Sequence, residues 1–167
     1  MQAKKIDERS AGPTRKFCTF YLAGRLYGVD ILHVKEISSV VRFTPIYHAP
    51  REVMGFVNIR GQIHLVLDLQ MLLGQEQEVE AEAGGRSLLV IFKPVVGESF
   101  GVLIDRIGDV VEIAEDEIED RRKTDEAPPD SGDRRNEGGN LVCGVCKLDS
   151  GLLIALNAKR FLEAVQV

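Results

Sequence analysis

The strongest constraint on the fold is an internal repeat, because residues 56–73 align without gaps to residues 145–162. Directly after the apolar run of each copy, Asp68 aligns with Asn157, and both residue types are good helix N-caps. The aligned apolar pairs are Ile59 with Leu148, Ile63 with Leu152, Leu65 with Ile154, Leu67 with Leu156 and Leu73 with Leu162. An earlier segment, 27–37, resembles 100–113 with three extra residues. We therefore expect two similar halves, at about residues 17–74 and 87–165.

Both halves carry the signals of short strands and tight turns. Residues 17–22 and 25–30 are β-prone runs on either side of Ala23-Gly24, which predicts a hairpin. Residues 87–93 and 99–104 repeat this pattern in the second half. Residues 29–37 fit either a short helical segment or a strand, because their apolar residues recur at a spacing of three.

The best-defined strand is predicted at residues 62–69, after a strand at 55–59 and a turn at Arg60-Gly61. One face of this strand carries Ile63, Leu65, Leu67 and Leu69, and the other carries Gln62, His64, Val66 and Asp68. Such alternation is typical of a half-buried strand. His64 is then interpreted as a surface or interface histidine. Asp68 is expected to cap a short helix that ends at Gly74.

These elements predict an all-β protein. Four or five short strands in each half cannot bury both faces of a flat sheet, so we expect each half to curl into a small barrel and to share apolar surface with its twin. The alternative is a single β-sandwich in which the similarity of the halves arose by chance.

Two charged segments lie outside the predicted strands. Residues 1–16 are polar and lack the features of a signal peptide, and they are expected to be a flexible N-terminus. Residues 114–140 contain Pro128-Pro129 and Gly138-Gly139 among charge blocks, which predicts a disordered insertion. This insertion is either an inert surface loop or an extra docking segment.

Charge and hydropathy limit the compartments and the classes of partner that are expected for this protein. Residues 115–137 hold ten acidic and five basic residues, which account for the whole net charge of -5. The rest of the chain has no basic excess, and this argues against binding to nucleic acid. No apolar run approaches the length that crosses a bilayer, so we expect a cytoplasmic protein without direct membrane insertion.

The cysteines raise the possibility of a metal or redox site. Cys143 and Cys146 have the Cys-x-x-Cys spacing, but the motif lies in a predicted strand and not at a helix N-terminus. A zinc site needs further ligands, and the remaining candidates are Cys18 and the three histidines. These candidates do not form a second closely spaced pair of ligands. We therefore expect buried thiols, no metal, no cofactor and no catalytic residues.

Several segments taken together resemble the CheW family: Tyr27–Ile37, then Gly55–Gly61, then Val66–Leu69. The resemblance extends over roughly residues 17–165 and implies two linked SH3-like five-stranded barrels. It also implies a non-catalytic adaptor that couples chemoreceptors to a CheA-type histidine kinase in a signalling array. The implied partners are the regulatory domain of the kinase and the cytoplasmic tip of methyl-accepting chemoreceptors.

The resemblance also implies a partner-binding surface. The Val-x-Glu-Ile motif of the family corresponds to Val34, Glu36 and Ile37, and the Asn-Leu-Arg-Gly motif corresponds to Asn58, Ile59, Arg60 and Gly61, with Ile59 in place of leucine. Glu36 and Arg60 are expected to form a polar pair, with Val34 and Gly55 nearby. On the residues alone, Arg60 also fits a solvated turn residue. The alternative function is a free-standing SH3-like module that binds a protein or peptide without kinase coupling, although no aromatic-lined groove is evident.

Overall fold

The computed structural model describes residues 12–39, 42–75, 88–119 and 141–165. It contains ten strands, one short α-helix and three short 3₁₀ turns within these residues. The elements of the first half are β1 (Thr14–Leu22), β2 (Arg25–Asp30), η1 (Ile31–His33), β3 (Val34–Ser39), β4 (Val53–Ile59), β5 (Gln62–Leu67) and α1 (Leu69–Leu72). Those of the second half are β6 (Leu88–Phe92), β7 (Phe100–Ile104), β8 (Arg106–Ala114), η2 (Glu115–Glu117), β9 (Val142–Leu148), β10 (Gly151–Leu156) and η5 (Ala158–Arg160).

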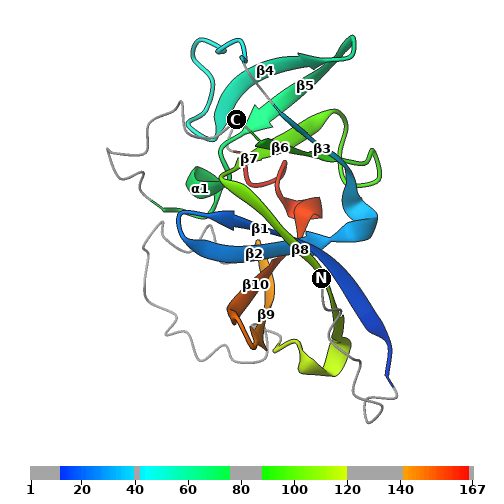
Figure 1. Ribbon diagram of the computed structural model, residues 1–167. Helices are drawn as coiled ribbons and strands as arrows, with labels where there is room; N and C mark the ends of the chain where they lie inside the picture. Colours follow the sequence, from blue (N-terminus) through cyan, green and yellow to red (C-terminus); the bar gives the residue numbers. More distant parts are fainter. Residues whose placement is uncertain (1–11, 40–41, 76–87, 120–140, 166–167) are drawn as a thin grey trace.

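The strands form two five-stranded sheets, which confirms the predicted all-β fold. We call the sheet of order β8-β1-β2-β10-β9 barrel A, and the sheet of order β3-β6-β7-β5-β4 barrel B. In Figure 1, barrel B lies above barrel A, and the C-terminal segment lies between them. Both sheets contain one parallel pair, β2 with β10 in barrel A and β7 with β5 in barrel B.

Each barrel takes strands from both halves of the sequence, so the expectation that each half curls into its own barrel is wrong. The hairpin β1–β2 pairs with β8, β9 and β10, whereas β6–β7 pairs with β3, β4 and β5. The chain crosses from one barrel to the other after β2, through η1, and again after β7. Sequence similarity identifies equivalent strands, but it does not tell which copy of a strand each neighbour pairs with.

Residues that are equivalent in the sequence repeat nevertheless occupy equivalent positions in the two barrels. Leu65 pairs with Phe100 in barrel B, and its counterpart Ile154 pairs with Tyr27 in barrel A. Asp68 accepts a hydrogen bond from the backbone N–H of Met71, while Asn157 accepts one from Lys159. Both predicted N-caps are therefore confirmed.

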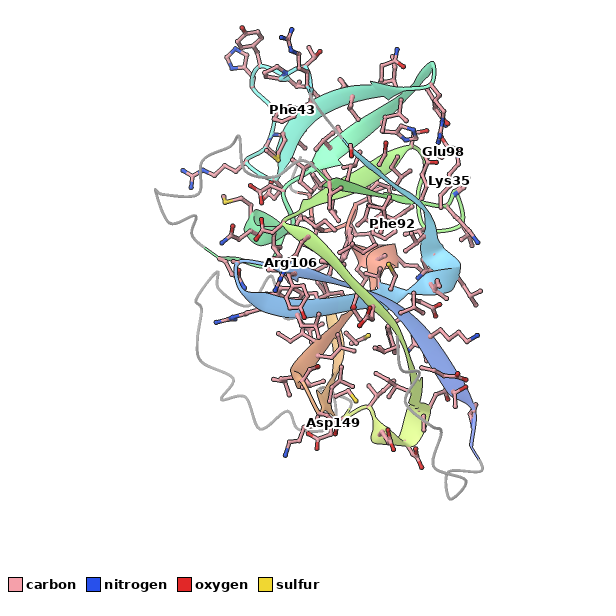
Figure 2. All side chains as sticks on the ribbon, in the orientation of Figure 1. Lys35, Phe43, Phe92, Glu98, Arg106 and Asp149 are labelled. Atoms are coloured by element: carbon pink, nitrogen blue, oxygen red, sulfur yellow. The ribbon has the colours of Figure 1, made fainter. Side chains whose placement is uncertain are left out.

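Three apolar clusters hold the fold together. The largest lies between the barrels and includes Phe20 and Tyr27 from barrel A with Phe92 and Phe100 from barrel B, and Phe161. Figure 2 shows Phe92 at the centre of the molecule. Each of these aromatic side chains is at most 2% exposed, and burying one contributes roughly 1.5–3 kcal/mol. The shared apolar surface that we expected between the twins is thus the main core.

Each barrel also has a smaller cluster of its own. The cluster of barrel B comprises Val57, Val66, Leu89, Ile91 and Leu103, and we call it the barrel B core. The cluster of barrel A comprises Phe17, Ile113, Cys146, Leu153 and Ala155.

Several predicted boundaries change. Strand β1 starts at Thr14, inside the segment expected to be flexible, and residues 1–11 lie outside the described residues. The segment 29–37 contains both predicted alternatives, with η1 followed by β3. The expected disordered insertion begins too early at 114, because η2 follows β8 and Glu119 forms a bridge with Val145. Residues 120–140 lie outside the described residues.

The exchange of hairpins predicts that neither half folds alone. Fragments 1–80 and 81–167 each lack the strands that complete their sheets, so each fragment should lack a cooperative unfolding transition, whereas an equimolar mixture should regain it. Circular dichroism with thermal melting measures this. A stable isolated half, with a melting temperature close to that of the intact chain, would contradict the observed topology.

Candidate functional site

The turn between β4 and β5 sets the position of Arg60. Both turn residues have left-handed backbone conformations, with φ of 51° at Arg60 and 82° at Gly61. The Asn58 side chain fixes the turn, because its Oδ1 accepts a hydrogen bond from the Gly61 N–H at 2.9 Å. A left-handed arginine costs about 1 kcal/mol, so the turn holds Arg60 in a conformation that a free chain rarely adopts.

Arg60 forms an ion pair with Glu36, as the family resemblance implied. Nη2 of Arg60 donates to Oε2 of Glu36, and the side chains are 72% and 27% exposed, respectively. Glu36 lies on β3 and Arg60 follows β4, and these two strands are the edges of barrel B. The ion pair therefore joins the two edges of the sheet where no backbone ladder connects them in the described residues. We call the region of Glu36, Arg60 and the turn the barrel B seam.

A second polar contact crosses the same seam. Nζ of Lys35 lies 3.5 Å from Oε1 of Gln62, and Nε2 of Gln62 donates to Ser99 Oγ at 3.3 Å. Figure 2 shows Lys35 and Glu98 on the same side of barrel B. Exposed polar contacts of this length contribute little to stability, so their effect is mainly to orient β3 against the β4–β5 hairpin.

Gly55 and Ile59 support the seam from within. Gly55 is buried with φ of 151°, and a Cβ built there would lie 2.1 Å from the backbone oxygen of Thr44. Thr44 and Phe56 exchange two backbone hydrogen bonds beside it. Ile59 packs on the barrel B core. Neither Gly55 nor Ile59 has the exposure expected of a main contact residue. Both therefore affect the seam by fixing the position of the β4–β5 hairpin that carries it.

Val34 lies two residues before Glu36 on β3. It is half-buried and packs on the large core between the barrels, and it pairs with Phe92 of β6. Val34 is therefore placed to fix the start of β3, which carries Glu36.

His64 is the residue that we interpreted incorrectly. It is only 3% exposed, whereas its neighbour Ile63 is 60% exposed, so the two faces of the β5 tip are reversed relative to expectation. His64 pairs with Val57 and shares its face with Val66, and both valines belong to the barrel B core. Beyond Leu65 the strand is buried on both faces, because one face meets the barrel B core and the other meets the shared core.

The repeat contains the signal that places His64. Its counterpart in the alignment of residues 56–73 with 145–162 is Leu153, which is fully buried, and the counterpart of Ile63 is Leu152, which is 50% exposed. The counterpart of Arg60 is Asp149. Barrel A thus has an apolar residue and an acid where barrel B has His64 and Arg60, and the polar seam distinguishes one barrel from the other.

The environment of His64 disfavours its charged form. Burial lowers the pKa of the imidazole, and Lys35 and Arg60 lower this pKa further, while Glu36 opposes them. His64 Nδ1 is buried, and no residue in the described ranges forms a hydrogen bond with it. At neutral pH the ring is therefore neutral.

The expectation of buried thiols holds for Cys18 and Cys146, whereas Cys143 is only half-buried. Cys143 and Cys146 lie on β9, and both contact the apolar cluster of barrel A. Burial raises the pKa of the Cys18 thiol. In the described part of the chain, no group of three or more His, Cys, Asp or Glu side chains is arranged to hold a metal ion.

A pocket of about 400 Å³ opens between the tips of the β1–β2 and β9–β10 hairpins in barrel A. Its lining includes Tyr21, Arg25, Leu152 and Ile154, and Tyr21 is the one aromatic side chain among the described residues that line it. This composition differs from the aromatic-lined grooves that bind proline-rich peptides. Among the described helices, none has the length and apolar character that spanning a membrane requires.

Two five-stranded barrels, each completed by strands from both halves of the sequence, define the fold class of this protein. Comparison with known proteins gives the family. Residues 16–166 match the model of the CheW-like domain, so the chain belongs to the CheW family. The members that it matches are named as chemotaxis and scaffolding proteins and not as enzymes.

Relatives and a solved structure agree with this assignment. The chemotaxis protein CheW of Treponema pallidum is 29% identical over 89% of this chain and 82% of the relative. That of Helicobacter pylori is 24% identical over 96% of this chain and 93% of the relative. The crystal structure of the scaffolding protein TtCheW from Thermoanaerobacter tengcongensis is 28% identical, with a TM-score of 0.69 over 90% of this chain and 94% of that chain.

The close approach at Gly55 predicts a strong effect of a single methyl group. Gly55→Ala should lower the free energy of unfolding by about 2–4 kcal/mol, because it adds a backbone clash to the strain of positive φ. Gly24→Ala is the control, since Gly24 has φ of 77° but open space around its Cβ position, and it should cost only about 1 kcal/mol. Urea denaturation measures both, and equal losses would rule out the clash.

Proposed function

We propose that this protein couples chemoreceptors to a CheA-type histidine kinase, and that the barrel B seam is part of its docking surface. The observation that supports this most is the Glu36–Arg60 pair, which lies on the edges of barrel B in the arrangement expected from the family motifs. The implied partners are the regulatory domain of the kinase and the cytoplasmic tip of the receptors. Signal transfer then depends on assembly and not on chemistry in this chain.

The exposure of the pair suits a docking role. Arg60 is mostly exposed, and its guanidinium has donors in a planar fork, so it can keep Glu36 and still offer N–H groups to a partner. An exposed ion pair contributes only about 0–1 kcal/mol to folding. Its loss should therefore affect binding more than stability.

Apolar side chains beside the seam add area for a contact. On the outer face of the β4–β5 hairpin, Phe56 is 43% exposed and Ile63 is 60% exposed. Phe56 pairs with Leu65 and Asn58 pairs with Ile63, so these side chains lie on one face next to the turn. A rigid hairpin that presents apolar residues beside a fixed charge has the composition of a protein-binding surface.

The test is reconstitution of kinase activity with a CheA-type kinase and receptor signalling fragments. Arg60→Glu places two carboxylates together and should weaken kinase binding about tenfold, with a corresponding loss of receptor-dependent kinase activation. Arg25→Glu is the matched control, because Arg25 is also an exposed arginine next to a hairpin turn and makes no ion pair among the described residues. Arg25→Glu should couple like the wild type.

A charge swap separates the geometry of the pair from its individual charges. The double variant Glu36→Arg with Arg60→Glu restores an attractive pair and should recover part of the binding if the pair acts by joining β3 to the hairpin. Full coupling by a folded Arg60→Glu variant would exclude the seam from the docking surface. Binding of a peptide alone, without a ternary complex of receptor and kinase, would favour the free-standing module instead.

A further inference from the structure

Beneath the barrel B seam lies a histidine whose position neither the family motifs nor the proposed coupling function explains. His64 occupies the core position that Leu153 fills in the twin barrel. It is 3% exposed and pairs with Val57, and its Nδ1 has no hydrogen-bond partner among the described residues. A buried polar atom without a partner is destabilising, so an apolar residue would be more stable here.

The charged groups that act electrostatically on His64 are those of the seam. From β3, Lys35 and Glu36 act on its charge, and Arg60 acts from the β4–β5 turn. The strands on the other side contribute apolar residues of the barrel B core, Leu89 and Ile91 from β6 and Leu103 from β7. In the described structure, Glu36 is the one acid that acts on the charge of His64, and it is already paired with Arg60.

We propose that His64 is a positioning residue for Arg60, and that its protonation releases Arg60 from Glu36 and loosens the barrel B seam. An imidazolium carries a proton on both ring nitrogens, and Nδ1 then needs an acceptor that the described part of the chain does not supply. Among the described residues, Glu36 is the carboxylate that acts electrostatically on His64, so the imidazolium competes with Arg60 for it. The added charge also repels Lys35 and Arg60, which act on His64 as like charges.

The direction of the pH effect follows from linkage. The closed seam, in which Arg60 is paired with Glu36, holds the pKa of His64 below its ordinary value of about 6.5, mainly through burial. His64 therefore takes up a proton less readily in this closed form than in the open form, in which the seam is loosened. The closed seam is therefore fully favoured above pH of about 6.5 and is progressively lost as the pH falls toward the pKa of the folded state. One proton changes the equilibrium by at most about tenfold per pH unit.

This inference rests on the proposed function for its binding readout, but the isolated protein supplies an independent one. In the NMR spectrum, titration from pH 7.5 to 5.5 should shift the His64 Cε1–H, the Arg60 Nε–H and the Gly61 amide together, with one apparent pKa. In His64→Leu, which carries the residue of the twin barrel, the Arg60 and Gly61 signals should stay constant over this range. The proposal would be overturned if the Arg60 and Gly61 chemical shifts did not change with the His64 titration, or if they changed equally in His64→Leu.

The binding experiment uses the CheA-type regulatory domain in calorimetry at pH 7.5 and 5.5. The dissociation constant of the wild type should rise several-fold at the lower pH, and that of His64→Leu should rise less. His48→Gln is the matched control, because His48 is exposed and should retain the pH dependence of the wild type. His33→Gln should retain it as well, since His33 lies outside the seam and its charge is governed mainly by burial and Asp30.

The two proposals fail in different ways. If the regulatory domain binds at neither pH, the coupling function is wrong, and the NMR titration still decides the role of His64. If binding is tight at pH 7.5 and falls equally in the wild type and in His64→Leu, the coupling function stands and the role of His64 is wrong. Should His64→Leu not fold, His64→Gln replaces it, with the same expected loss of pH dependence.

Discussion

The interleaving of the two hairpins is the constraint on which the rest of the structure depends. Parallel pairing of β2 with β10 and of β5 with β7 links strands that are distant in sequence, and parallel strands cannot be joined by a tight turn. Each half therefore completes the sheet of the other, and the large core contains residues of both halves. The result is one body on which β3 and the β4–β5 hairpin keep a fixed relation.

Within this body, the seam shows how weak contacts give a defined geometry. The Glu36–Arg60 pair is too exposed to stabilise the fold much, and the Lys35–Gln62 contact is long. Their effect depends on elements that are already rigid: the turn fixed by Asn58 and the close passage of Thr44 over Gly55. The backbone sets the positions of the seam side chains, and their charges determine which groups they can bind.

Local signals predicted local structure well. The positive-φ turn at Arg60-Gly61, the caps Asp68 and Asn157, and the ion pair of Glu36 with Arg60 all follow from residue type, spacing or family motif. The exchange of strands did not, because both copies of a strand have nearly the same pattern and pairing is decided by long-range packing. Alternation within one strand predicts the wrong face for His64, because it does not show which face is buried, whereas the apolar repeat partner Leu153 marks the buried face.

The twin barrels arose from one pattern, yet they differ at the equivalent positions Arg60 and Asp149. A molecule with two identical ends would offer every neighbour the same choice twice, and its contacts would have no direction. The difference in charge gives this molecule a distinguishable front and back. Neighbours that recognise only one end would then be added in a single orientation, which is the condition for an ordered, head-to-tail assembly.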